Sequence, residues 1–276
     1  EVPHYLRGVK TQVFHGLAGE KKSHFRIRSY FDLYLTQGPY FTRWFSKAAS
    51  KHKDFSVVET GWPKLDVYGK ELHKYDSDKL TLLKKSKAKK IILYAPTFSP
   101  SLTSASHLLT QIEELAKSKE YLIVIKFHDL MAEDLIDSYK KLSMRFKNVL
   151  FIEERNIIKY LLIADLMISD TSSVVYEFLL LDKPVITFKN NSLAVKWDNQ
   201  LLFSGLVKRV AENLLEDPFK QQRLEILKEY HPYTDGNSAK RMVDAVEEYI
   251  KKNGVPEKRL ISWFRRYKIN KIFSKI

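Results

Sequence analysis

The chain has 276 residues, of which 44% are hydrophobic, 13% aromatic and 29% charged, a composition that excludes a mostly disordered or collagen-like protein. It carries 47 Lys and Arg against 33 Asp and Glu, and a formal net charge of +14 favours anionic partners. There is no cysteine, which excludes disulfides, Cys-ligated zinc, iron–sulfur clusters and a thiolate nucleophile, and favours a reducing compartment.

Residues 1–68 form the first and less regular segment. Short β-rich runs predict strands at 12–14, 31–36 and 55–59, and a helix is expected at 40–49. This segment is α/β but too short for a complete doubly wound domain, and the first residue is Glu rather than Met. We therefore expect it to be the C-terminal remainder of a domain whose N-terminal part lies outside the chain.

Residues 69–252 form a second, more regular α/β domain. Its strands are near-continuous apolar runs, as expected of a parallel sheet buried on both faces, and helical patterns alternate with them. The predicted strands are 91–94, 121–127, 149–152, 166–169 and 184–188. The predicted helices are 102–118, 131–146, 157–163 and 173–181, and helices at 206–215, 218–230 and 237–252 are expected to close this domain. The basic stretch 84–90 is a solvated linker or helix face.

Residues 253–276 form a basic, aromatic tail. The last twenty residues contain seven Lys or Arg and one Glu. Its apolar residues lie on two opposite helical faces, so one continuous amphipathic helix is not expected. Basic and aromatic residues together favour contact with an anionic membrane surface, and a frayed cationic terminus is the alternative. No run approaches the roughly 18–20 apolar residues that would span a bilayer.

Three hydroxyl side chains, Thr171, Ser172 and Ser173, follow the buried strand at 166–169 and precede a helix. Hydroxyls and unbonded N–H groups at such a position can hold a phosphate, although the same residue types also serve as plain helix caps. Glu177 lies four residues after Ser173 and therefore on the same helical face, where a carboxylate can bind ribose hydroxyls. An acidic residue in an early helical turn is also common for dipole reasons alone.

Two histidines stand where predicted strands end. Lys126 and His128 close the strand at 121–127, where they can contact a diphosphate and where the histidine can protonate a leaving phosphate. His15 precedes Gly16, which suits an exposed general base near neutral pH. Taken locally, each histidine is better explained by an ordinary loop or turn. Their shared position at the carboxyl ends of strands favours a site.

Several common motifs are absent from the sequence. It contains neither a GxGxxG dinucleotide fingerprint nor a GxxxxGK[ST] phosphate loop, and no HExxH or GxSxG. No metal site or cofactor is therefore predicted, and a divalent cation is not implied.

The order of these segments resembles the CDP-glycerol glycerophosphotransferase family. The similarity rests on His15-Gly16, FDLYLTQGPYF, TGWPKLD, ILYAPTF, KFHD, LMISDTSSVVYEFLLLDKPVITF and DGNSAKRMVDAV, and it covers about 13–248. The resemblance implies a GT-B-like fold: two doubly wound Rossmann-like domains, of which the N-terminal one is incomplete in this chain, followed by C-terminal helices. Residues 1–68 would then belong to the acceptor side, and 69–252 would bind the nucleotide.

The resemblance also implies an activity, namely transfer of glycerol phosphate from CDP-glycerol to a hydroxyl of a lipid-linked glycan, with release of CMP. It assigns catalytic roles to His15 and His128. It assigns donor binding to Thr171, Ser172, Ser173 and Glu177, and the strand-end position of Lys126 adds this residue to the predicted donor site. Departures from the family pattern at 17–19 and 98–99 leave the choice of glycerol, ribitol or another alditol open.

The expected partners are a CDP-alditol donor, a polyprenyl-diphosphate-linked glycan acceptor and an anionic membrane surface, which would place the protein on the cytoplasmic face of the cell membrane. Its oligomeric state is not predicted. Three alternatives remain open. The chain could be a GT-B glycosyltransferase or epimerase that uses a UDP-sugar, or a CDP-binding module without turnover. A nucleic-acid-binding protein is disfavoured, because the basic residues are dispersed and no aromatic–basic stacking platform is present.

Overall fold

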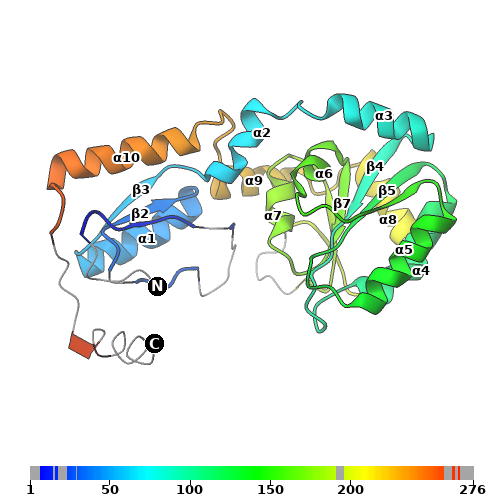
Figure 1. The fold of residues 1–276 in the computed structure, drawn as a ribbon, viewed down its shortest axis with the longest axis horizontal. Helices are drawn as coiled ribbons and strands as arrows, with labels where there is room; N and C mark the ends of the chain where they lie inside the picture. Colours follow the sequence, from blue (N-terminus) through cyan, green and yellow to red (C-terminus); the bar gives the residue numbers. More distant parts are fainter. Residues whose placement is uncertain are drawn as a thin grey trace. The chain divides into compact units, whose positions relative to one another are not determined.

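The structure is a computed structural model in which residues 7–14, 16–17, 24–28, 30–190, 196–257, 263–264 and 267 are described. The chain divides into two compact units, each considered separately below (Figure 1). Unit 1 comprises Glu1–His15, Lys21–Asp66 and Tyr230–Ile276, and unit 2 comprises Gly16–Glu20 and Val67–Glu229.

Unit 1 contains a parallel sheet in the order β1-β2-β3, with strands Thr11–Gln12, Leu33–Thr36 and Ser56–Glu59. Helix α1 (Pro39–His52) packs on one face, where the Tyr34 ring stacks on Phe45 with centroids 5.2 Å apart. Because side chains alternate along a strand, Leu33 and Leu35 point to the opposite face. The strands predicted at 31–36 and 55–59 and the helix predicted at 40–49 are present, whereas the strand predicted at 12–14 shares only Gln12 with the observed strand, Thr11–Gln12.

Helix α10 (Ser238–Asn253) covers that opposite face, with Met242 and Ala245 packed against Leu33 and Leu35. The sequence pattern placed residues 237–252 in the second domain, whereas the structure assigns α10 to unit 1. The physical reason is that β2 is buried on both faces and needs a second apolar cover, which no other helix of unit 1 supplies within the described residues.

The start of α10 is held by the segment that follows β3. The carboxylate of Asp66 accepts hydrogen bonds from the backbone N–H groups of Ser238 and Ala239, at 2.8 and 2.9 Å, and so caps the helix. Gly61 has a φ of +84°, and a Cβ atom there would lie 2.4 Å from Ser238 Oγ. Only glycine allows the two segments to approach this closely.

A buried histidine joins the same two segments. The Nε2 atom of His231 accepts the Trp62 N–H at 2.9 Å, and burial lowers the pKa of His231 to about 4. The ring is therefore neutral near pH 7, as its acceptor role requires.

Unit 2 contains six parallel strands in the order β6-β5-β4-β7-β8-β9. Their bounds are Lys90–Tyr94 (β4), Tyr121–Lys126 (β5), Val149–Ile152 (β6), Leu166–Ser169 (β7), Val185–Phe188 (β8) and Asp198–Gln200 (β9). The five predicted strands of the second domain are all present. β9 was not predicted, because its three residues are all polar and carry no apolar pattern.

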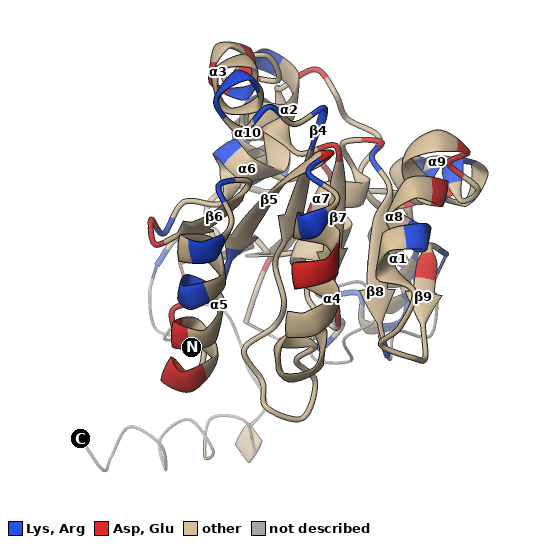
Figure 2. Ribbon diagram, turned by 90° about the vertical axis from the view of Figure 1, so that its right-hand side faces the viewer, with Lys and Arg blue, Asp and Glu red and all other residues tan. Residues whose placement is uncertain are grey.

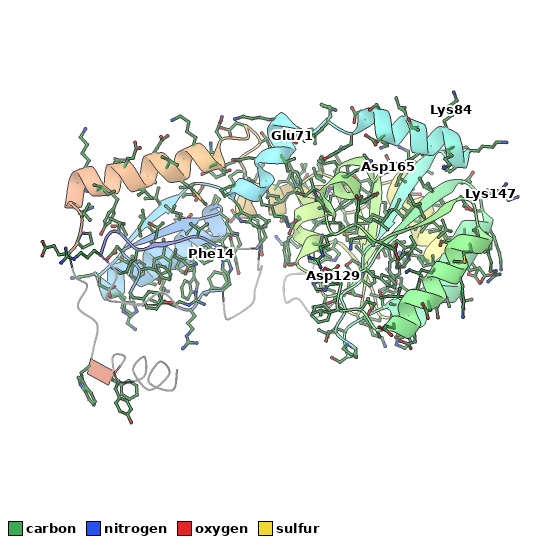
Figure 3. All side chains as sticks on the ribbon, in the orientation of Figure 1. Phe14, Glu71, Lys84, Asp129, Lys147 and Asp165 are labelled. Atoms are coloured by element: carbon green, nitrogen blue, oxygen red, sulfur yellow. The ribbon has the colours of Figure 1, made fainter. Side chains whose placement is uncertain are left out.

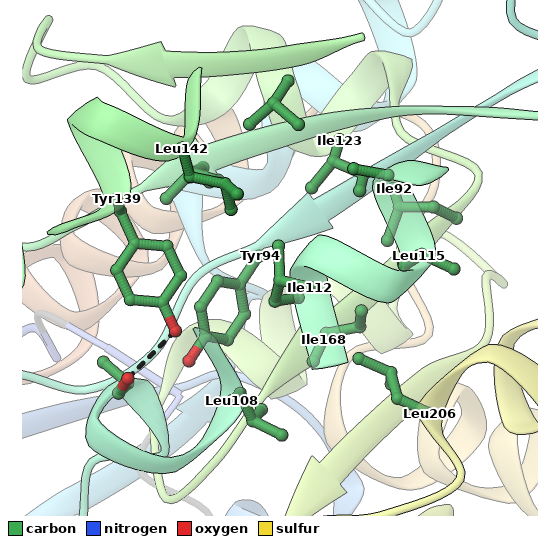
Figure 4. Close-up of a cluster of buried hydrophobic side chains, with 14 of the residues drawn as sticks. Ile92, Tyr94, Leu108, Ile112, Leu115, Ile123, Tyr139, Leu142, Ile168 and Leu206 are labelled. Atoms are coloured by element: carbon green, nitrogen blue, oxygen red, sulfur yellow. Dashed lines mark hydrogen bonds between the residues drawn. The ribbon is translucent and has the colours of Figure 1, made fainter. Parts of the chain in front are cut away.

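Helices cover both faces of this sheet. They are α2 (Val67–Lys70), α3 (Asp76–Ser86), α4 (Ala105–Lys117), α5 (Glu133–Arg145), α6 (Ile158–Ile163), α7 (Val174–Leu179), α8 (Leu206–Leu215) and α9 (Lys220–Tyr230); a 3₁₀ turn, Pro63–Asp66, precedes α2. The main core lies between the sheet and helices α4, α5 and α8. There Tyr139 donates its hydroxyl hydrogen to the Ala105 carbonyl at 2.9 Å (Figure 4).

The charges on α5 follow the helix dipole. Figure 2 shows acidic residues in its first turn, where Glu133 and Asp134 lie, and basic residues toward its end at Arg145. Within the described residues, none of the helices has both the length and the apolar character needed to cross a membrane.

A buried arginine clamps two turns of unit 2. The Arg223 side chain is 2% exposed, and it bonds Asp182 at 2.8 Å and both carboxylate oxygens of Asp217 at 2.8 and 2.6 Å. Both aspartates have left-handed backbones, with φ of 53° and 46°. The guanidinium therefore stabilises two turns in a left-handed conformation, which is uncommon for residues other than glycine, although aspartate tolerates it better than most.

Replacing Arg223 with Met should lower the free energy of unfolding by about 2–4 kcal/mol, because two carboxylates lose their cation and two strained turns lose their clamp. Urea denaturation measures this change. Arg209→Met is the control: Arg209 is 44% exposed and 3.6 Å from Glu212, so we expect a change within about 0.5 kcal/mol. Equal effects of the two substitutions would contradict the clamp.

Candidate functional site

The strand order of unit 2 indicates the edge where a candidate ligand site is expected. The chain begins the sheet at β4, adds β5 and β6 on one side, and then adds β7, β8 and β9 on the other. In such sheets ligands bind beyond the carboxyl ends of the strands, at the point where the order reverses, here between β4 and β7. Figure 3 shows Asp129, which follows β5, far from Lys147 and Asp165, which precede β6 and β7.

The Asp170 side chain links the loop that follows β7 to the loop that follows β4. Its side chain is fully buried directly after β7, and its carboxylate accepts the N–H groups of Thr97 and Ser104 and the Ser104 hydroxyl, at 2.8, 2.8 and 3.0 Å. Burial raises the pKa of Asp170 to about 6, and the hydrogen bonds from Ser104 and Thr97 oppose that rise. The loop after β4 is thus fixed against the end of β7.

The three predicted hydroxyl residues follow Asp170. Thr171 and Ser172 are partly exposed and Ser173 is exposed. Ser173 occupies the N-cap of α7 but makes no side-chain cap hydrogen bond, so the structure does not support an ordinary capping role for it. Because α7 has only six residues, its dipole carries little weight, and the predicted anion site would depend on the hydroxyls.

Lys126 is a buried cation at the end of β5. The Lys126 residue is 7% exposed, and its Nζ atom donates a hydrogen bond to the Phe127 carbonyl oxygen at 2.6 Å. In the part of the chain that the structure describes, no carboxylate pairs with it. Because a buried charge is stable only when it is compensated, an anionic ligand is the natural partner for Lys126.

His128 lies two residues further along and is exposed. Its Nδ1 accepts the Leu130 N–H at 3.1 Å, and its ring packs on Phe98 with centroids 4.6 Å apart. An accepting Nδ1 assigns the proton of the neutral ring to Nε2. The geometry therefore supports donation of a hydrogen bond from neutral His128 to a phosphate oxygen.

A cavity of about 160 Å³ lies beside these two residues. It is lined by Lys126, His128, Asp129, Lys140, Phe151 and Glu153, among others. Lys140 pairs with Glu153 and lies over the Phe151 ring. In the described residues, no group of three or more His, Asp or Glu is placed to hold a metal ion.

Glu177 is 5% exposed in the first turn of α7, four residues after Ser173 as expected. The structure thus brings six of the predicted site residues to one edge of the unit 2 sheet: Lys126, His128, Thr171, Ser172, Ser173 and Glu177. The two groups follow β5 and β7, which flank β4, so the strands that carry them are about 10 Å apart. His15 lies outside the described residues.

Sequence reasoning did not assign a role to Asp170, Thr97, Ser104 or Phe98. Asp170 is part of the SDTSS segment, and its position between a buried strand and three hydroxyl residues could have indicated a role for it in the site. Its contacts with Thr97 and Ser104 depend on the pairing of β4 with β7, which no local pattern reveals.

Asp170 should make stability depend on pH. The unfolded chain releases this proton near pH 4, whereas the folded chain keeps it until about pH 6, so the wild type should lose stability relative to Asp170→Asn as pH rises from 4 to 7. The difference should change by on the order of 3 kcal/mol, measured by urea denaturation at each pH. Asp129→Asn is an exposed control. A difference that does not vary with pH would contradict this assignment.

A family model and several known proteins match the chain. Residues 8–193 match the model described as CDP-Glycerol:Poly(glycerophosphate) glycerophosphotransferase, which is more than half of the chain. The teichoic acid glycerol-phosphate primase of Bacillus subtilis (strain 168) is 28% identical over 237 residues, covering 82% of this chain and 60% of that protein. The teichoic acid ribitol-phosphate polymerase TarL of Staphylococcus aureus (strain NCTC 8325 / PS 47) is 29% identical, covering 69% of this chain and 37% of that protein.

Solved structures share the fold. The wall teichoic acid polymerase TagF superposes with a TM-score of 0.63 at 19% identity, covering 88% of this chain and 68% of that chain. A complex of S. aureus MnaA with UDP superposes with a TM-score of 0.61 at 16% identity, covering 87% and 69%. The predicted GT-B-like α/β fold is thereby confirmed. The chain spans about 60% of the length of the first curated relatives.

Proposed function

Because the chain belongs to the CDP-glycerol:poly(glycerophosphate) glycerophosphotransferase family, we propose that it transfers an alditol phosphate from a CDP-alditol to an acceptor hydroxyl and releases CMP. The observation that carries this proposal is the buried Lys126, a cation without a carboxylate partner among the described residues, on the sheet edge that also carries the 171–173 hydroxyls. Glycerol phosphate is the group that the family model names, and ribitol-phosphate polymerases are also similar.

In the proposed reaction, the acceptor oxygen forms a bond to the phosphorus that carries the alditol, and the bond from that phosphorus to the CMP oxygen breaks. Negative charge develops on CMP, and the acceptor proton moves to a base. Lys126, the Nε2–H of His128 and the hydroxyls of Thr171, Ser172 and Ser173 would stabilise that charge. Their spacing on either side of β4 suits a single extended nucleotide.

The proposed base is His15, on the basis of the resemblance of its His-Gly pair to that of the family. It follows Phe14, which is buried and stacks on His24 with centroids 4.3 Å apart, so the chain is anchored immediately before it. A histidine side chain can accept a proton near neutral pH.

The proposed acceptor is a glycan linked to polyprenyl diphosphate, reached from the cytoplasmic face of the membrane. Support comes from the basic tail and from three exposed aromatic side chains in its described part, Trp263, Phe264 and Tyr267. Aromatic and basic residues together bind anionic lipid surfaces. Most of the tail lies outside the described residues.

Binding of donor analogues tests the donor site. By calorimetry we expect CDP-glycerol or CDP-ribitol and CMP to bind, and UDP-N-acetylglucosamine to bind more weakly. Lys126→Met, and separately Ser172→Ala with Ser173→Ala, should weaken CDP-alditol binding by on the order of tenfold to a hundredfold, because charge-assisted hydrogen bonds are lost.

Ser138→Ala, on the exposed face of α5, is the control and should bind like the wild type. A preference for the UDP-sugar would instead assign the chain to the nucleotide-sugar enzymes of the same fold.

His15→Ala should lower turnover of CDP-glycerol by on the order of a hundredfold or more while CDP-glycerol binding stays nearly unchanged, because a general base acts only in the transition state. Steady-state kinetics and calorimetry separate the two effects, with the exposed His52→Ala as control. Parallel losses of binding and turnover would assign His15 to substrate binding. Donor binding without turnover in the wild type would identify a CDP-binding module.

A further inference from the structure

Tyr68 carries a buried hydroxyl that the fold does not use. It lies in α2 (Val67–Lys70), the first short helix of unit 2. Its hydroxyl oxygen is shielded from solvent and has no hydrogen-bond partner among the described residues. Most buried polar groups in folded proteins are bonded, so an orphaned hydroxyl requires a specific explanation.

Glu177 is the acidic group beside it. Burial raises the pKa of the Tyr68 hydroxyl well above its usual value, and the negative charge of Glu177 raises it further. Tyr68 is therefore a neutral phenol whose hydrogen is available for donation. Glu177 is 5% exposed and lies one turn after Ser173, the last of the three hydroxyls at the proposed donor site.

A buried phenol that lies within electrostatic reach of a carboxylate is complementary to an alcohol. The hydroxyl of an alcohol has one hydrogen to donate and two lone pairs to accept with. It can donate to the Glu177 carboxylate and accept the Tyr68 hydrogen at the same time. A carboxylate has about four acceptor positions, so it can take this bond in addition to others.

We propose that Tyr68 and Glu177 together bind a hydroxyl group of the nucleotide, and that this hydroxyl belongs to the ribose of the CDP-alditol. This inference rests on the proposed function and adds Tyr68, which neither the sequence pattern nor the family resemblance singled out. Tyr68 would give the site a preference for CMP over the deoxy analogue that lacks the contacted hydroxyl. An ordered water bonded to Tyr68 is the competing explanation, and it predicts no such preference.

The test is calorimetric binding of CMP, 2′-deoxy-CMP and 3′-deoxy-CMP to the full chain and to Tyr68→Phe. The variant should bind CMP about five- to tenfold more weakly, the loss of roughly one hydrogen bond. For one of the two deoxy analogues, the wild type and the variant should bind equally, because the hydroxyl that contacts Tyr68 is missing. Tyr121→Phe, at the opposite edge of the same sheet, should bind all three like the wild type.

The stability of the ligand-free variant is a second readout. Because the hydroxyl makes no bond in the free protein, the unfolding midpoint of Tyr68→Phe should equal or exceed that of the wild type. A lower midpoint would show that the hydroxyl has a partner within the fold and would overturn the inference.

The binding outcomes separate this inference from the proposed function. If Tyr68→Phe binds CMP as tightly as the wild type, or loses equal affinity for CMP and both deoxy analogues, the ribose contact is wrong and the donor site stands. If the wild type binds neither CMP nor a CDP-alditol, the proposed function and this inference both fail.

Discussion

The buried carboxylate of Asp170 is the interaction on which the proposed site depends. Three hydrogen bonds from Thr97 and Ser104 converge on it, so the loop that follows β4 is held against the end of β7. The same contacts place Phe98 one residue away, where its ring supports His128. The hydroxyl residues that follow β7 and the lysine and histidine at the end of β5 thus lie on either side of one set of hydrogen bonds. A rigid site of this kind loses little conformational entropy when a ligand binds.

The hydrogen bonds of Asp170 also show which polar residues of this segment stabilise the fold and which are accessible to a ligand. The Asp170 carboxylate accepts its hydrogen bonds from the loop after β4, and the Ser169 hydroxyl donates a hydrogen bond to the Ala95 carbonyl at 2.7 Å. Both residues therefore stabilise the fold. The three hydroxyl residues that follow are at least partly exposed and therefore accessible to a ligand. Polar residues of similar type within one short segment thus divide between structure and recognition, and only the tertiary contacts reveal which do which.

Sequence reasoning predicted the strands that are long and apolar, because burial on both faces leaves a continuous pattern. It also predicted that six candidate residues lie at one edge of the unit 2 sheet, and they do, since the carboxyl ends of parallel strands share an edge whatever their order; the roles of these residues stay a prediction. It missed β9, whose residues are polar, and it assigned α10 to the nearer domain in sequence. The partner of α10 is β2, some two hundred positions earlier, and an amphipathic stripe does not say which sheet it will cover.

The return of α10 to the first sheet has a consequence for the order in which the chain folds. Unit 2 is complete once residue 229 has been synthesised, whereas the sheet of unit 1, made first, lacks its cover until residues 238–253 emerge from the ribosome. During translation, the side chains of Leu33 and Leu35 therefore stay exposed to solvent while unit 2 can already be folded. The contacts that finish unit 1 have very large sequence separations, and such contacts form slowly. Nascent chains of this protein would need protection at β2 for most of their synthesis.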